Sequence, residues 1–192
     1  MRVKSEPTSR LTLTAFDRAH SSCPTFTYSH WPHTQSVQPS PSHFASFEKL
    51  LRDPESELVH FIEAGPSDDD QAGYLYAFLS DEVPDAIKVG FSKPERIDKR
   101  LSEHLACYHE IQKIMDPVNM RLEKLAENSV KSILRHFGEE LKVDCPSGKH
   151  DQHIEWFKAR SGVGLGEWRD TVIAAIDWVS RNKSTGGRDE KR

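Results

Sequence analysis

The sequence contains no long apolar run, few cysteines and no excess of positive charge. Its uncharged apolar runs extend over only a few residues, far short of the ~20 that a membrane-spanning helix needs, so we expect no membrane segment. The three cysteines, Cys23, Cys107 and Cys145, are odd in number and widely spread. That pattern argues against a disulfide framework and predicts an intracellular protein, nuclear or cytoplasmic. Because the net charge is −4, nucleic-acid binding would require a local basic patch.

The two ends of the chain are predicted to be disordered tails. Residues 1–43 are rich in Ser, Pro, Thr and His and have too little apolar surface to offset the entropy of ordering, and residues 183–192 form a polar tail. Four histidines of the first tail are interpreted as scattered polar residues rather than a metal site: His20, His30, His33 and His43. Acidic residues interrupt the basic ones near the start, so mitochondrial import is not expected.

The segment between the tails, residues 44–182, is predicted to form one α+β domain with its core at 73–158. Helical spacing of apolar residues predicts helices at 44–56, 94–108, 121–138 and 164–182. Strands are predicted at 57–64, 73–78, 87–91, 109–116 and 153–159, with loops at 65–72 and 139–152. The second and third of these strands are expected to form a hairpin, so helices would cover a small sheet that contains antiparallel strands.

The predicted hairpin carries two tyrosines and a lysine. Tyr74 and Tyr76 share one face of their strand, and Lys88 and Gly90 share one face of the partner strand. Pairing would bring the Lys88 ammonium near a tyrosine hydroxyl, where it would lower the pKa of Tyr76 and make it a candidate general base. The alternative is that the tyrosines are ordinary half-buried aromatics and that Lys88 is a solvated edge residue.

Two helices add side chains that suit phosphate and metal binding. Arg96, Arg100 and His104 are spaced four residues apart on one helix face, in a stretch that also contains Lys99. A guanidinium group matches two phosphate oxygens. On the helix at 121–138, Glu127 projects a carboxylate of the type that holds a divalent cation together with a phosphate oxygen. Taken singly, each of these residues is also typical of a solvated helix surface.

The order and spacing of these residues resemble the GIY-YIG nuclease superfamily over residues 73–157. Tyr74-Leu75-Tyr76 is similar to the first block of the family, and Lys88-Val89-Gly90 is similar to the second. The closing EWF at 155–157, and the lysine that opens the second block, resemble the branch of bacteriophage-Orf DNA-binding domains and their fungal relatives.

The two helices extend the resemblance. KRLSEHL is similar to the arginine helix of the family, with Arg100 at the arginine and His104 four residues later. LAENSVKSIL resembles the glutamate helix, with Glu127 at the position of the metal-binding carboxylate.

The resemblance implies a DNA-binding domain and, beyond that, a divalent-metal-dependent endonuclease that hydrolyses phosphodiester bonds. It implies that Tyr76, with Lys88 beside it, accepts a proton from the attacking water. Arg100 would stabilise the extra charge on the phosphate, and Glu127 would hold Mg²⁺ or Mn²⁺. The remaining candidate DNA contacts are Tyr74, Arg96, Lys99 and His104.

Two departures from the family pattern leave alternatives open. The distance along the chain from Gly90 to Arg100 is longer than is common, so Arg96 is a rival for the catalytic arginine. Lys131 stands where many relatives have a histidine. The alternatives are a catalytically inactive DNA-binding module and a protein-interaction domain on the same scaffold.

A second cluster precedes the EWF motif. Cys145, His150 and His153 lie within DCPSGKHDQHIEWF, and Cys107 is a further candidate. Cysteine and histidine are the usual ligands of structural zinc. Gaps of five and three residues match no standard zinc knuckle, so a polar loop with incidental histidines is the preferred interpretation and Zn²⁺ is not the expected cofactor.

Overall fold

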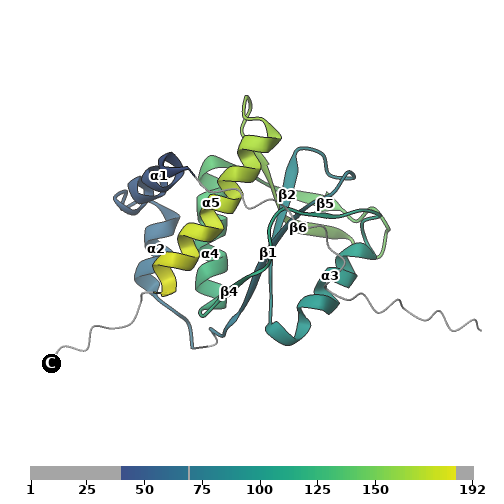
Figure 1. Cartoon of the computed structure of the whole chain (residues 1–192), viewed down its shortest axis with the longest axis horizontal. Helices are drawn as coiled ribbons and strands as arrows, with labels where there is room; N and C mark the ends of the chain where they lie inside the picture. The colour runs from purple at the N-terminus through teal and green to yellow at the C-terminus, as the bar shows by residue number, and fades with distance from the viewer. Residues whose placement is uncertain (1–39, 69, 185–192) are drawn as a thin grey trace, which may run out of the picture.

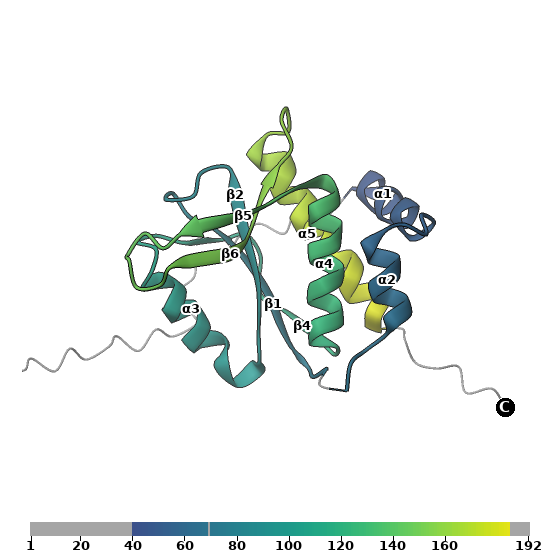
Figure 2. The same cartoon turned by 180° about the vertical axis from the view of Figure 1, so that it is seen from behind.

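Helices cover both faces of an antiparallel sheet in the computed structural model, which describes residues 40–68 and 70–184. Helices α1 (Pro41–Leu51), α2 (Glu57–Ala64), α4 (Glu123–Phe137) and α5 (Leu165–Ser184) gather on one side, and α3 (Ile97–Leu105) lies on the other (Figure 1, Figure 2). The predicted α+β class is confirmed. Among the described residues, no helix is both long enough and apolar enough to cross a membrane.

The sheet is built around a central hairpin. Its strands are β1 (Gly73–Leu79), β2 (Ala86–Ser92), β3 (Gln112–Lys113), β4 (Val118–Met120), β5 (Gly138–Asp144) and β6 (Gln152–Ala159). The order across the sheet is β3-β1-β2-β6-β5, with β4 also pairing with β1, and every pair is antiparallel. The predicted β1–β2 hairpin is confirmed, and its register sets Tyr76 opposite Gly90 and Phe78 opposite Lys88.

Alternation along the strands divides the apolar residues between two cores. Leu75 and Ala77 point into the large core beneath α1, α2, α4 and α5, whereas Tyr76 and Phe78 belong to a smaller core beneath α3. The small core also takes Leu101 of α3, which confirms the centre of the apolar stripe predicted for that helix. The face of β1 that carries Tyr76 therefore packs against α3.

The predicted helices are confirmed, with small changes at their ends. A short 3₁₀ turn over Pro94–Arg96 precedes α3, so the α-helix itself starts at Ile97. Two residues expected on buried faces are exposed instead: Leu51 is 37% exposed at the end of α1, and Leu165 is 39% exposed at the start of α5. Both sit in a terminal turn, where less of the partner surface remains to cover them.

The strand predicted at 57–64 is wrong, because these residues form helix α2. The Ser56 hydroxyl accepts a hydrogen bond from the Leu58 backbone N–H at 3.2 Å and caps the helix, and Glu57 lies in its first turn. Leu58 is fully buried in the large core, and Ile62 packs against that core one turn later. The apolar pattern of a short segment can fit either a strand or a helix. Here the capping serine favours the helix.

Two further predictions need correction in the sheet. The polar stretch after α4 was expected to be a loop, but β5 runs through it and pairs with β6, with Leu141 and Val143 packed against the small core. The strand predicted at 109–116 is reduced to β3, and the separate strand β4 was not predicted. Of the predicted tails, residues 1–39 and 185–192 lie outside the described residues, whereas 41–43 already belong to α1 and 183–184 to α5.

Candidate functional site

The Tyr76 side chain lies directly across Gly90 of the partner strand. A Cβ atom added at Gly90 would stand 2.4 Å from the Tyr76 hydroxyl oxygen, closer than real side chains approach one another. Glycine at this point of β2 therefore makes room for the tyrosine. The requirement explains in physical terms why a glycine stands at this position of β2.

The Tyr76 hydroxyl interacts with two residues of α3. It lies 2.8 Å from Nε2 of His104, and the charge of the nearby Arg100 guanidinium opposes the rise in its pKa that burial causes. The hydroxyl hydrogen of a protonated tyrosine is available to an unprotonated ring nitrogen. Burial, together with the charges of Lys88 and Arg100, lowers the pKa of His104 to about 3, so its ring is neutral and accepts that hydrogen.

The predicted activation of Tyr76 by Lys88 is wrong. Burial raises the pKa of Tyr76 to about 12, although Arg100 opposes this, so the phenol keeps its proton at neutral pH. The Lys88 ammonium points elsewhere: it lies 3.0 Å from Oε2 of Glu155 and also donates to the carbonyl of Ile154. Burial lowers the pKa of Lys88, and the neighbouring Glu155 opposes that shift.

Glu155 and Lys131 complete a chain of buried charges that connects β2 to α4. Lys131 lies 2.8 Å from Oε1 of Glu127 and also binds Oε1 of Glu155, which in turn binds Lys88. The side chains in this chain are between 3% and 19% exposed, so solvent screens them weakly. The sequence provided Glu127 and Lys88, but neither Glu155 nor Lys131 was identified as a member of the site.

The two carboxylates of this chain differ in their pKa. Burial disfavours ionisation of Glu155, but the ammonium groups of Lys88 and Lys131 outweigh it and lower the pKa to about 2. Burial raises the pKa of Glu127, because Lys131 is its one close cation and the charge of Glu155 adds to the cost of ionising it. Glu155 is therefore fixed as a carboxylate, whereas the charge of Glu127 depends on what lies beside it.

Glu155 reaches this position through a bulge in β6. The register shifts between Leu141 and Val143 of β5, so β6 carries an extra residue opposite them. Glu155 itself has φ 71°, a left-handed conformation that is uncommon for a residue with a side chain and costs about 1–3 kcal/mol. Bulges frequently redirect a side chain at a functional site, and this one turns a carboxylate toward Lys88.

Basic residues of α3 and of the turn that precedes it border an open groove next to this cluster. The groove has a volume of about 240 Å³ and is lined by Phe91, Ser92, Lys93, Arg96, Arg100 and Glu123. Arg96 therefore joins Arg100 at the surface, whereas the exposed Lys99 does not line the groove and Tyr74 is half-buried on β1. Arg100 is the link between the two regions, since it borders the groove and also interacts electrostatically with buried Tyr76.

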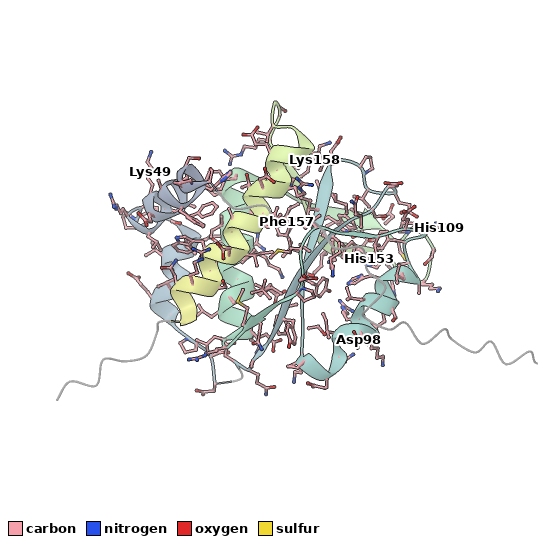
Figure 3. All side chains as sticks on the ribbon, in the orientation of Figure 1. Lys49, Asp98, His109, His153, Phe157 and Lys158 are labelled. Carbon is pink, nitrogen blue, oxygen red and sulfur yellow. The ribbon has the colours of Figure 1, made fainter. Side chains whose placement is uncertain are left out.

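Three of the four zinc candidates lie close together, on the α3 side of the sheet. Cys107 and Cys145 are buried with free thiols, and together with His153 they bring three ligand atoms within 4.8 Å of one another. His153 lies on the side of the sheet that carries Asp98 of α3, whereas Lys49 lies among the helices opposite (Figure 3). His150 is exposed in the β5–β6 connection, with its ring 5.5 Å from that of His153.

No protein-family model matches this chain, and no curated protein or solved structure matches it either.

Proposed function

We propose that this protein binds the phosphate backbone of DNA through the basic groove at the start of α3 and hydrolyses a phosphodiester bond at the adjoining cluster. The observation that carries the proposal is that the charges of Arg100 on α3 and Glu127 on α4 both act on the pKa of Tyr76, which burial on β1 raises. The GIY-YIG resemblance calls for this set of residue types. The proposal follows from their proximity together with a basic groove beside them.

Arg100 is the natural first contact for a phosphate. Its side chain is 45% exposed and lies 3.2 Å from Glu103, a weak surface pair that a phosphate would replace with a bidentate one. The side chains that line the groove include three cations, Lys93, Arg96 and Arg100, but only one carboxylate, Glu123. That excess favours an anion at the mouth of the site.

Tyr76 and His104 provide a path for a proton. Since Tyr76 is protonated, it accepts a proton from an attacking water only as it passes its own to His104, whose neutral Nε2 lies 2.8 Å away. Lys88 has an indirect role in this scheme: it fixes Glu155, and its charge helps to keep His104 neutral.

Glu127 is the residue that would hold Mg²⁺ or Mn²⁺. Its carboxylate and that of Glu155 both contact Lys131, and carboxylate oxygens are the ligands these hard cations prefer, so the donor set fits. A bound cation would supply electrostatic stabilisation to the departing oxygen. Lys131 would have to give up its contact with Glu127, so we expect weak metal affinity.

The position of Lys131 also favours a second candidate function, DNA binding without cleavage. Its ammonium already neutralises both carboxylates and takes the place that a divalent cation would use. In a module of this kind, Arg96 and Arg100 would still contact phosphate, but the chain of buried charges would serve the fold alone.

A plasmid-nicking assay with Mg²⁺ or Mn²⁺ separates the two functions. We expect metal-dependent nicking that falls ~100–1000-fold in Arg100→Ala, the usual cost of losing a placed charge stabiliser. Glu127→Gln keeps the shape of the side chain and is expected to abolish the metal response, whereas Glu139→Gln, at an exposed position of β5, should behave as wild type. Nicking that persists in Glu127→Gln would contradict the assigned role.

Binding and metal response together identify the second candidate. Salt-sensitive duplex binding without nicking by the wild type would support the module. In that case Lys131→Met should expose both carboxylates, and Mn²⁺ should raise its melting temperature more than that of the wild type. Absence of duplex binding at low salt would contradict both functions and leave a protein-interaction domain.

A further inference from the structure

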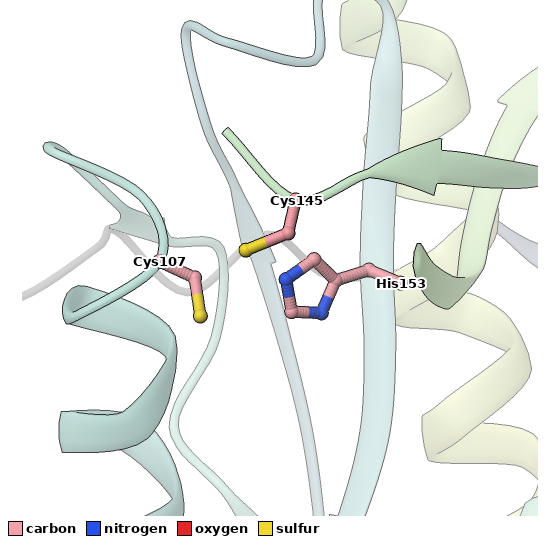
Figure 4. Close-up of side chains that lie close together, drawn as sticks. All are labelled: Cys107, Cys145 and His153. Carbon is pink, nitrogen blue, oxygen red and sulfur yellow. The ribbon is translucent and has the colours of Figure 1, made fainter. Parts of the chain in front are cut away.

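Two cysteines and a histidine from distant parts of the chain converge beside the small core. Cys107 follows α3, Cys145 follows β5, and His153 lies near the start of β6. Their ligand atoms all lie within 4.8 Å of one another. In Figure 4 a ring nitrogen of His153 points toward the sulfur atoms of both cysteines.

The state of His153 is a second and independent indication of a ligand. Its Nε2 atom is buried and, within the part of the chain that the structure describes, has no hydrogen-bond partner. A buried nitrogen of this kind is costly, because it has lost water and gained nothing in exchange. A metal ion between Nε2 and the two sulfurs would satisfy it.

The chemistry of the three donors selects among metals. Thiolate and imidazole groups favour zinc over magnesium, calcium or manganese, which prefer oxygen. Ligand atoms of one tetrahedral zinc ion lie roughly 3.6–3.8 Å apart, so the present group would need only a small contraction to bind it. The phosphate site described above has carboxylates instead, so the two sites would hold different ions.

We propose that Cys107, Cys145 and His153 bind one Zn²⁺, with His150 as the fourth ligand. His150 is the residue in reach, since its ring lies 5.5 Å from that of His153 and its side chain is exposed and free of the core. Sequence spacing argued against zinc because it took Cys145, His150 and His153 as one local motif. The geometry brings Cys107, which the sequence offered only as a further candidate, next to Cys145 and His153.

The ion would have a structural role with a consequence for the neighbouring site. The core beneath α3 has 10 buried residues against 22 in the large core, and cores this small are commonly reinforced by a metal or a disulfide. The ion would tie the end of α3, which carries Arg100 and His104, to β6, which carries Glu155. It would thus fix the position of Arg100 and His104 relative to Glu155.

Metal content and Co²⁺ absorption test the proposal on the full chain, purified with a thiol reductant. We expect about one zinc per chain, and its replacement by Co²⁺ should give the strong visible bands of a tetrahedral site with sulfur-to-metal charge transfer. His153→Cys preserves a tetrahedral ligand set and adds a thiolate, so its charge-transfer absorbance should rise by about half. This variant keeps the test informative if Cys107→Ser or Cys145→Ser fails to fold.

Matched controls separate these ligands from other cysteines and histidines. Cys23→Ser, at a position outside the described residues, and His136→Ala, at an exposed position of α4, should each retain one zinc. His150→Ala should weaken zinc binding, and unchanged affinity would overturn the assignment of the fourth ligand. A wild-type chain that binds neither Zn²⁺ nor Co²⁺ under reducing conditions would overturn the site, as would a Cys107–Cys145 disulfide that persists in reductant.

Discussion

The pKa of Tyr76 depends on burial more than on the charge of any neighbouring residue. It is 2% exposed, and the loss of water around the phenol raises its pKa more than Arg100 lowers it. Glu155 and Glu127 add to the increase through their negative charge. At neutral pH the phenol is therefore protonated and hydrogen-bonded to His104, and it is not a preformed phenolate.

The ionisation of Tyr76 can be followed by tyrosinate absorbance. We expect the difference between the titrations of wild type and Tyr76→Phe to appear near pH 12, because the pKa of Tyr76 is about 12. A raised pKa means that the neutral phenol stabilises the fold: this contribution is complete below the ordinary value of about 10 and is lost as pH rises through 12. A difference that appears below pH 10 would contradict this expectation and support the predicted activation of Tyr76 by Lys88.

At the level of the element, one irregular position in β6 determines whether the buried charges are paired. A regular strand would alternate without interruption, but the bulge at Glu155 delivers a carboxylate to lysines from β2 and α4. The left-handed φ at this residue is the local cost of that arrangement. Three elements are thereby joined by one side chain.

Glu155→Gln is expected to lower the free energy of unfolding by about 3 kcal/mol, because removing one partner of a buried pair leaves the other charges uncompensated. Lys88, whose side chain is 3% exposed, would lose its only ion-pair partner among the described residues. Urea unfolding measures the change. Glu139→Gln on exposed β5 serves as the control and should change stability by less than about 0.5 kcal/mol. An equal, small effect in both variants would show that the ion pairs contribute nothing.

For the whole molecule, the distribution of charge matters more than its total. The chain has a net charge of −4, yet Lys93, Arg96 and Arg100 border one groove whose lining includes a single carboxylate, Glu123. A protein of this kind is expected to approach DNA with one face only. The opposite side, with four helices over the large core, would supply support.

The salt dependence of duplex binding tests this orientation. Each phosphate contact that is lost should reduce the slope of log K against log salt by about 1, so Arg96→Ala should bind more weakly and with a shallower slope. Arg52→Ala, on the side of α1 and α2, should leave both quantities unchanged. Equal effects of the two substitutions would place the DNA elsewhere or show that binding is diffuse.

Local sequence signals determined most of the helices and the central hairpin of this protein. Apolar residues at helical spacing specify α4 and α5 because burial of one face is decided along a single segment. Tyr76, Lys88, Arg100 and Glu127 were identified as candidates in the same way, from residue type and order. The prediction for 57–64 was wrong because its apolar pattern suits both a strand and a helix, and β5 was missed because its residues are mostly polar.

Only the tertiary structure decided how the charges pair and what surrounds them. Lys131 and Glu155 belong to the site because α4 and a bulged β6 meet beside β2, and no spacing along the chain encodes that meeting. The same holds for Cys107, which joins Cys145 and His153 across the small core. The pKa of Tyr76 was predicted with the wrong sign, since burial is a property of the packed molecule and outweighs nearby charge there.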